Sequence, residues 1–347
     1  KMVAITGTNG KTTVTTLVAA MITASGRRAI AAGNIGLPLV DAVGRPADVV
    51  VAEVSSFQLQ FTESFRPDVS CWLNLAEDHL DWHPTLAHYA AAKARIWAAQ
   101  GPGDVAVLGA DDPAVMAAAG DPAHGLPAGV TRWTFSTSGP ADFSVDRASG
   151  LLTGPGASPL VEIGRLRRAL PHDLTNGLAA AACALAVGAT AEGCRQALEG
   201  FEPLPHRVEL VADAAGVRWY DDSKATTPAS ELAAVAGFDS VVLIAGGRNK
   251  GLDLGVLATA VPPVRAVVAI GEAACEVEEA FRGRVQVMVA RSMADAVATA
   301  SQVSRPGDAV LLSPACASFD WYRNYAERGQ DFAALVTAQL GRAGKEA

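Results

Sequence analysis

Short apolar runs that alternate with helical patterns constrain this chain more than any other feature of its sequence. The runs are rich in β-branched residues, and such alternation is typical of parallel strands joined by helices. In the first half, the expected strands lie at residues 3–6, 49–54, 69–75 and 105–108. The expected helices there lie at residues 12–25, 86–99, 174–187 and 191–198. The sequence therefore predicts an α/β fold with a mostly parallel sheet.

Two segments interrupt this alternation. Residues 132–170 form short stretches rich in Gly, Pro and Ser, which predict an antiparallel addition to the sheet or an edge of it. Residues 201–205 contain two prolines, which stiffen the chain and cannot donate hydrogen bonds to a sheet, so we place a linker there. Strands are expected beyond it at 208–211, 217–220, 241–245, 264–270, 285–289 and 309–312. We predict two domains, 1–203 and 204–347, the second smaller and Rossmann-like.

Charge and cysteine usage exclude several classes of partner. Acidic residues outnumber basic ones by 36 to 28, a balance that disfavours binding to nucleic acid. The longest uncharged stretch, 174–191, is interrupted by polar residues and glycine and predicts no membrane span. The five cysteines are far apart and form no C-x-x-C pair, which favours a reducing compartment. We therefore expect a cytoplasmic protein with neither a membrane nor a nucleic-acid partner.

Residues 7–12, Gly-Thr-Asn-Gly-Lys-Thr, lie between an expected strand and an expected helix. Glycines in this position let backbone N–H groups face an anion at the helix N-terminus. Lys11 can then reach the outer phosphates of ATP, and the Thr12 hydroxyl can bind Mg²⁺. Ile5 stands where the usual phosphate-loop pattern has its first glycine. The motif predicts a nucleotide site, with a kinase, a motor and a ligase all open; its residues are Thr8, Asn9, Gly10, Lys11, Thr12 and Thr13.

Potential metal ligands follow two other expected strands. Glu53 ends one of them, and residues 77–83, Glu-Asp-His-Leu-Asp-Trp-His, follow the next. Side chains at the carboxyl ends of parallel strands meet ligands at that edge of the sheet. His79 and His83 would suit zinc, but no cysteine cluster accompanies them, and a carboxylate-rich phosphate site favours Mg²⁺.

Several motifs, in one order from end to end, resemble the Mur ligase family, the ATP-dependent amide-forming enzymes of peptidoglycan precursor synthesis. They lie at residues 6–13, 77–81, 89–93, 172–176 and 205–209. Residues 221–226 and 312–320 are similar to those of family members that add D-glutamate to UDP-N-acetylmuramoyl-L-alanine. The resemblance implies a central ATPase domain and a C-terminal amino-acid domain. It also implies a further N-terminal UDP-binding domain, so we expect a monomeric fragment with weak activity or none.

The resemblance further implies residue roles in an acyl-phosphate mechanism. Lys11 would hold the β- and γ-phosphates of ATP. Thr12 and Glu53 would bind one Mg²⁺ and His79 a second. Lys93 stands where the family carries a carbamylated lysine, which is reasonable because Mg²⁺ would repel a bare ammonium. The stretch from His79 to Lys93 is one residue shorter than the family pattern predicts.

Other roles implied by the resemblance concern the nucleotide and the two substrates. Asn176, Arg207 and Asp222 would contact the nucleotide, although residues 172–173 are His-Asp where the family more usually has His-Asn. Asn34 would lie near the muramoyl substrate. The residues expected around D-glutamate and the closing phosphates are Lys224, Thr226, Lys250, Ser318, Phe319 and Tyr325. Lys11, His79, Lys93 and Lys224 would be catalytic, and the two domains would close over ATP before reaction.

Two alternatives remain at this point. The chain can resemble another family member that adds a different amino acid, or one that adds glutamate to folate; residues 222–226 and 313–320 argue against both. It can also be a nucleotide-binding interaction module without catalysis. Phosphate release in the presence of UDP-N-acetylmuramoyl-L-alanine, D-glutamate, Mg²⁺ and ATP distinguishes an enzyme from such a module.

Overall fold

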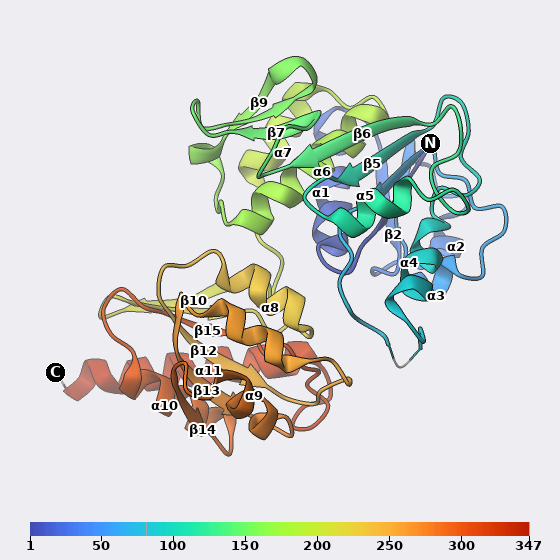
Figure 1. Ribbon diagram of the computed structural model, residues 1–347. Coiled ribbons are helices and arrows are strands. Elements are labelled where there is room, and N and C mark those ends of the chain that lie inside the picture. The colour runs from blue at the N-terminus through green and yellow to red at the C-terminus, as the bar shows by residue number, and fades with distance from the viewer. Residues whose placement is uncertain (81, 347) are drawn as a thin grey trace. The chain divides into compact units, whose positions relative to one another are not determined.

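The computed structural model describes residues 1–80 and 82–346 of the chain and divides into two compact units. The first unit comprises Lys1–Ala76 and Trp82–Glu202. The second comprises Pro203–Ala347 together with the short segment Glu77–Asp81. Each unit is a mostly parallel sheet with helices on its faces, so the predicted α/β class is confirmed (Figure 1).

The described residues of the first unit form a nine-stranded sheet in the order β2-β3-β1-β4-β5-β6-β7-β8-β9. Neighbouring strands from β2 to β7 are parallel, whereas β8 and β9 run antiparallel at one edge. The strands are β1 Met2–Thr6, β2 Ala29–Gly33, β3 Val49–Glu53, β4 Val69–Trp72, β5 Val105–Gly109, β6 Thr131–Ser136, β7 Phe143–Asp146, β8 Leu151–Gly154 and β9 Ser158–Glu162.

Side-chain alternation along these strands supplies a separate core to each face of the sheet. In β1, Val3 and Ile5 enter one core and Ala4 enters the other. The first core is closed by α1 Lys11–Ala24, α6 Pro171–Ala186 and α7 Ala191–Gly200. The second is closed by α3 Ser56–Leu59, α4 Leu86–Ala94 and α5 Pro113–Ala119, while α2 Leu39–Ala42 contacts β2. Burial on both faces explains why these strands read as continuous apolar runs.

The second unit has a six-stranded sheet among its described residues, in the order β10-β11-β15-β12-β13-β14. Only the β10–β11 pair within this described sheet is antiparallel. The strands are β10 Glu209–Ala214, β11 Val217–Asp221, β12 Val241–Gly246, β13 Val264–Ile270, β14 Gln286–Val289 and β15 Ala309–Leu312. The helices are α8 Pro228–Val235, α9 Ala274–Phe281, α10 Met293–Val303 and α11 Tyr325–Glu346. The described residues also form 3₁₀ helices, at Pro155–Ala157 and Ile163–Arg165 in the first unit and at Leu254–Ala260 in the second.

Three differences from the sequence-based expectations have simple physical reasons. Strand β2, Ala-Ile-Ala-Ala-Gly, was not expected because alanine and glycine carry little strand signal. Residues 132–170 do form one edge of the sheet, as one of the two expectations had it, but only β8 and β9 are antiparallel, whereas β6 and β7 continue the parallel order. The helix expected over 86–99 ends at Ala94, and turns follow it.

Two further features of the structure are the character of its helices and the burial of its cysteines. No helix in the part of the chain that the structure describes has the length and apolar character needed to cross a bilayer. All five cysteines are free thiols, and four of them are buried. Cys275 is the exposed one, so four of the cysteines are small residues of the core.

Candidate functional site

The phosphate loop joins the end of β1 to the start of α1. Gly10 precedes the helix with φ 83°, a left-handed conformation that glycine adopts without strain. A Cβ atom at Gly10 would lie 2.5 Å from Asn176 Oδ1, so a larger residue would also collide with α6. Among the described residues no side chain caps α1, and its first turn carries no acidic residue. An uncapped helix N-terminus of this kind is suited to an anion.

Lys11 folds back onto this loop. Its Nζ donates to the carbonyl oxygens of Gly7 and Thr8, at 2.8 Å in each case. Its side chain is only partly buried, as is that of Thr12, while Thr8 and Thr13 are buried. The ammonium therefore lies at the loop already and needs only side-chain rotation to meet a phosphate.

Asn74 holds the loop from the neighbouring strand and was not among the predicted site residues. Its Oδ1 accepts hydrogen bonds from the N–H groups of Thr8 (3.0 Å) and Asn9 (2.8 Å). Its Nδ2 donates to the carbonyl oxygen of Asn9 at 3.2 Å. The sequence analysis placed Asn74 inside the expected strand 69–75, whereas β4 ends at Trp72 and Asn74 lies in the loop beyond it.

Glu53 lies at the same edge of the sheet as the loop, because it pairs with Ile5 in the parallel β1–β3 register. Its side chain is buried, and Oε1 accepts from Asn34 Nδ2 at 3.3 Å. Among the described residues, Oε2 has no hydrogen-bond partner. A buried carboxylate oxygen without a donor is costly unless a cation binds it. Glu53 therefore fits a hard cation such as Mg²⁺ beside the phosphate loop.

Lys93 points from α4 toward the same loop and is 1% exposed, which excludes its interpretation as a helix-surface lysine. Its Nζ donates to Gly7 O at 2.8 Å and approaches Thr6 Oγ1 at 3.5 Å. It also lies 4.4 Å from the ring centroid of Tyr89, whose hydroxyl is 3.5 Å from Thr8 Oγ1. The loop, Glu53 and Lys93 are thus brought together in the first unit.

The histidines weighed as a zinc pair have other partners. His83 is buried in the first unit, with Nε2 2.9 Å from Ser56 Oγ and Nδ1 3.0 Å from His88 Nδ1. His79 lies in the segment that groups with the second unit, and its Nε2 is 3.3 Å from Asp78. Asp78 also accepts from Lys250 Nζ at 2.7 Å. Lys250 and the segment that carries His79 are therefore joined in the second unit.

Asp173, the departure from the family's His-Asn pattern, caps α6. It accepts two hydrogen bonds from Arg168, at 2.7 and 2.8 Å, and one from the N–H group of Leu170 at 3.0 Å. Arg168 matches the added negative charge, so Asp173 has a structural function at the helix start. Asn176 lies farther along the same helix, buried against Gly10.

In the second unit, the loop after β11 carries Asp222 and Lys224. Asp222 is buried, accepts from the hydroxyl of Ser313 at 2.8 Å and from the N–H group of Val208 at 3.2 Å. Burial raises the pKa of this carboxyl to about 7 in spite of these donors. Lys224 Nζ lies 3.7 Å from the ring centroid of Tyr325, a cation–π geometry. Two predicted D-glutamate residues are therefore in contact.

Arg328 connects this loop to the loop after β15 and was not predicted. It is 1% exposed and donates to Ser223 Oγ at 2.9 Å and Ser223 O at 2.8 Å. It also donates twice to Cys316 O, at 3.1 Å in both cases. Burial lowers the pKa of Arg328 to about 10. The buried guanidinium thus fixes the segment that leads to Ser318.

The remaining predicted residues of the second unit differ in exposure. Ser318 is buried, and Thr226 and Arg207 are partly buried. Phe319 is 62% exposed, so it is a surface residue and does not belong to the core. Its position leaves the side chain accessible to a ligand or to solvent.

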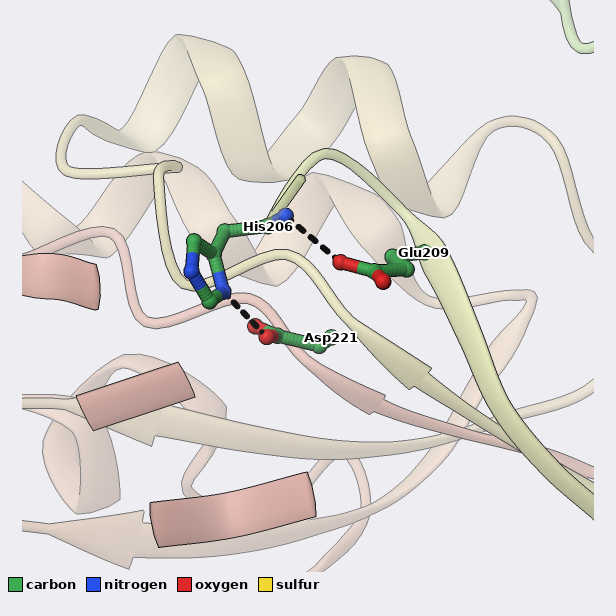
Figure 2. Close-up of side chains that lie close together, drawn as sticks. All are labelled: His206, Glu209 and Asp221. Atoms are coloured by element: carbon green, nitrogen blue, oxygen red, sulfur yellow. Dashed lines mark hydrogen bonds and ion pairs between the residues drawn. The ribbon is translucent and has the colours of Figure 1, made fainter. Parts of the chain in front are cut away.

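His206, Glu209 and Asp221 form a group with the spacing of metal ligands (Figure 2), since one ligand atom of each lies within 4.8 Å of the others. Hydrogen bonds account for this arrangement. His206 Nδ1 lies 2.6 Å from Asp221 Oδ2, and the backbone N–H of His206 donates to Glu209 at 2.9 Å. Asp221 Oδ1 accepts from the N–H group of Ser223 at 2.8 Å. We interpret the group as a structural element at the start of the second unit.

Protein families and individual relatives similar to this chain were found by comparison. The Mur ligase middle domain family matches residues 5–184, and the Mur ligase glutamate ligase domain family matches residues 206–316. A UDP-N-acetylmuramoylalanine--D-glutamate ligase of Desulfosudis oleivorans is 44% identical over 338 residues, covering 96% of this chain and 73% of the relative. The ligase of the same name from Geobacter metallireducens is 42% identical over 342 residues, covering 97% and 74%.

Solved structures share the fold at lower identity. MurF ligase of Thermotoga maritima, determined in complex with ADP, has a TM-score of 0.73 at 17% identity and covers 99% of this chain and 81% of its own. A bifunctional folylpolyglutamate synthase/dihydrofolate synthase of Yersinia pestis, determined with AMPPNP and a Mn ion, has a TM-score of 0.65 at 17% identity, with coverages of 96% and 88%.

Proposed function

Because this chain belongs to the Mur ligase family, whose members are ATP-dependent amide-bond-forming ligases, we propose that it joins D-glutamate to UDP-N-acetylmuramoyl-L-alanine in peptidoglycan precursor synthesis. The observation that carries the proposal is the meeting of the phosphate loop, Glu53 and Lys93 at one sheet edge. The 44% identity to a D-glutamate ligase supports the choice of amino acid. ATP and reduced thiols are both found in the cytoplasm, so we propose action there, and the family resemblance alone implies a monomer.

The chemistry explains why a phosphate site is needed. A free carboxylate is a poor electrophile, so an oxygen of the alanyl carboxylate first bonds to the γ-phosphorus of ATP. The bond from that phosphorus to the β,γ-bridging oxygen breaks, and ADP leaves. The amine of D-glutamate then attacks the acyl carbon, a proton leaves the nitrogen, and inorganic phosphate departs as the amide forms. Little covalent chemistry is left to the protein, which acts by positioning and charge neutralisation.

Residues 1–203 supply the nucleotide part of the proposed site. Lys11 binds the β- and γ-phosphates from the loop, and Gly10, Thr12 and Thr13 offer N–H groups at the start of α1. Thr12 and Glu53 would hold Mg²⁺, which supplies positive charge to the phosphate oxygens. The unpartnered Oε2 of Glu53, among the described atoms, supports this assignment.

A second Mg²⁺ site would use His79 and a carbamylated Lys93. The ammonium of Lys93 now donates to Gly7 O; release of two protons from Nζ and formation of a bond from Nζ to the carbon of CO₂ would give a carbamate, whose oxygens can bind a cation. The position of Lys93 supports the modification, because its side chain is buried and its Nζ lies at the phosphate loop, away from solvent. Asn34, bonded to Glu53, would lie near the muramoyl substrate.

Residues 204–347 supply the amino-acid part. Lys224, Thr226, Lys250, Ser318, Phe319 and Tyr325 would bind D-glutamate and close on the phosphates. The contact of Lys224 with Tyr325 supports this grouping, because a dicarboxylate needs cationic partners. Asn176, Arg207 and Asp222 would contact the nucleotide. Residues from both domains are required, so we infer a rotation of one domain toward the other about residues 203–205.

The test combines the chain with UDP-N-acetylmuramoyl-L-alanine, D-glutamate, Mg²⁺ and ATP. We expect phosphate release and an amide product, identified by its mass, that both require D-glutamate. Mass spectrometry is chosen because it detects even slow turnover, and diaminopimelate in place of D-glutamate is the matched control. Product with diaminopimelate would favour another member of the family. ATP binding without any product, even after long incubation, would show that this chain by itself binds nucleotide but does not complete the ligase reaction.

A further inference from the structure

We propose that Asn74 is the residue that sets the orientation of the phosphate loop, so that the N–H group of Gly10 faces the phosphates. This inference rests on the proposed function, since it takes the loop as the nucleotide site. It goes further by dividing the loop into two parts. Thr8 and Asn9 are bound to Asn74 by their backbones, whereas residues 10–13 provide the anion-binding N–H groups.

Hydrogen bonding between β1 and β4 continues beyond the last paired residues of the two strands. Thr6 pairs with Trp72 in the parallel register, and the N–H group of Leu73 donates to Thr6 O at 3.0 Å. The N–H group of Thr8 next lies 3.1 Å from the carbonyl oxygen of Asn74, as well as 3.0 Å from its Oδ1. The ladder between the two strands therefore continues into the loop through the Asn74 backbone, and the Asn74 side chain extends the attachment to Asn9.

Thr8 adds a second connection between the same two segments. Its hydroxyl donates to the carbonyl oxygen of Ala76 at 3.1 Å and accepts from the N–H group of Ala76 at 2.9 Å. Gly7 permits this close approach, because a Cβ atom there would lie 3.0 Å from Leu73 Cβ. The first half of the loop is therefore attached to residues 74–76 at several points.

The hydrogen bond from Asn74 to the Asn9 carbonyl has a directional consequence. In a trans peptide, the carbonyl oxygen of one residue and the N–H group of the next point in opposite directions. Because Asn74 Nδ2 holds Asn9 O on its own side, the N–H group of Gly10 points to the other side of the loop. Gly10 has φ 83°, a region in which glycine can exchange between backbone conformations at little cost. A separate constraint on the 9–10 peptide is therefore required.

Every carbonyl oxygen between Gly7 and Asn9 has a donor. Gly7 O accepts from Lys11 and Lys93, Thr8 O accepts from Lys11, and Asn9 O accepts from Asn74. A carbonyl oxygen that turned toward a phosphate would repel it. The donors hold these oxygens away, and for Asn9 the donor is an uncharged amide that is not needed at the phosphates.

The N–H groups in the second half of the loop, residues 10–13, must instead point toward the phosphates. The first backbone hydrogen bond within α1 runs from Val14 to Gly10, so residues 11–13 have no acceptor inside the helix. Asparagine suits the position of residue 74 because one planar amide both accepts twice and donates once. Aspartate would accept but not donate, and it would add a negative charge near the anion. Leucine has a similar shape and can do neither.

The experiment compares the affinity of the chain for MgADP with its affinity for adenosine, by calorimetry. Adenosine lacks phosphates, so the ratio of the two affinities isolates the loop. We expect Asn74→Leu to lower the affinity for MgADP on the order of tenfold while that for adenosine changes less than twofold. Asn74→Asp keeps both acceptor bonds and is the second variant, expected to fold and to weaken MgADP binding in the same way.

Gln100→Leu is the matched control. Gln100 is a buried amide of the same unit that bonds to Ser70, to Pro67 O and to Val105 O. Its loss should lower thermal stability without changing the ratio of affinities. Faster hydrogen exchange of the Thr8 and Asn9 amides in Asn74→Leu is the expected second readout.

The outcomes separate this inference from the proposed function. If the wild-type chain does not bind MgADP, the proposed function itself is wrong. If it binds and both Asn74 variants keep the wild-type ratio, Asn74 is only a structural residue and the inference is overturned. A ratio that falls equally in Gln100→Leu would also overturn it, because loss of any buried amide would then suffice.

Discussion

The two units bury polar groups in different ways. In the first unit they gather at the phosphate loop, where Lys93 donates to Gly7 O and Glu53 presents an oxygen without a partner among the described residues. In the second unit, Arg328 is surrounded by hydrogen-bond acceptors, and Glu231 is completely buried with neither carboxyl oxygen bonded within the described chain. The first arrangement surrounds the proposed nucleotide site, whereas the second is internal.

This difference predicts where substitutions take effect. A change at the loop of the first unit should appear in nucleotide affinity and reaction rate, with little change in stability. A change at the buried groups of the second unit should appear in its free energy of unfolding and in the pH dependence of that energy. Measuring both quantities for each variant tests the comparison directly.

The largest effect is expected for Lys11→Ala. The ammonium that now bonds to Gly7 O and Thr8 O would no longer be available to the transferring phosphoryl group. Loss of such a charge should lower the rate of amide formation by roughly a hundredfold to a thousandfold. The melting temperature should stay near that of the wild type, because Lys11 is only partly buried. Product formation is measured by mass, with Thr23→Ala in the same helix as control; a loss below tenfold would contradict the proposed role.

In the second unit, Arg328→Met should be strongly destabilising. It would leave Ser223 O and Cys316 O buried without their donors, at a cost of about 3 kcal/mol or more in the free energy of unfolding. Urea denaturation followed by hydrogen exchange would assign the loss to the second unit. Arg323→Met is the control, since its ion pair with Glu327 lies at the surface, and no resolvable change is expected. Equal effects of the two variants would show that burial of Arg328 contributes little.

Glu231→Met should stabilise the second unit near neutral pH. Burial raises the pKa of Glu231 well above its usual 4.5, and the negative charge of Asp222 raises it further. The stabilisation associated with the protonated acid is complete below pH 4.5 and is lost as the pH rises through the folded-state pKa. An apolar side chain removes this loss, so we expect a gain of about 1 to 3 kcal/mol above neutral pH.

The measurement is the free energy of unfolding from pH 5 to pH 9. The wild-type value should fall with rising pH, and the slope should decrease in Glu231→Met. Part of the slope should remain, because Asp222, with a pKa of about 7, shifts in the same direction. Glu278→Met at the exposed face of α9 is the control. Identical slopes in wild type and Glu231→Met would show that burial does not raise the pKa of Glu231 in the folded protein.

Local patterns explain why much of the architecture could be predicted. Strands such as Val241–Gly246 are buried on both faces, so they appear as unbroken apolar runs. The phosphate loop is also local, because glycines, a lysine and a helix start lie within six residues. Strand β2 was missed because its alanines and glycine carry little strand signal and only Ala32 among its residues is buried.

Long-range contacts explain what the sequence could not provide. Asn74 meets Thr8 and Asn9 across 65 or more residues, and Arg328 meets Ser223 across 105. No local sequence pattern at Asn74 or Arg328 identifies the residues that it contacts. Lys93 is a different case. Helix periodicity alone would have placed its side chain at the surface, whereas the resemblance of residues 89–93 to a family motif indicated a functional role. The structure shows that the side chain is buried.

The smallest effect is expected for Asp173→Asn, which restores the more usual residue of the family. Asparagine keeps an acceptor for the N–H group of Leu170 but loses the ion pair with Arg168, in which both side chains are 17% exposed. We expect a loss of about 1 kcal/mol in the free energy of unfolding of the first unit. Affinity for MgADP should change less than twofold, because Asp173 is engaged at the helix start. Arg168→Gln should have a similar effect, and the double variant should lose little more than either single one, since both remove the same ion pair. If Asp173→Asn instead altered MgADP affinity tenfold with unchanged stability, Asp173 would belong to the ligand site, and the division between ligand-facing and internal polar groups would need to be redrawn at α6.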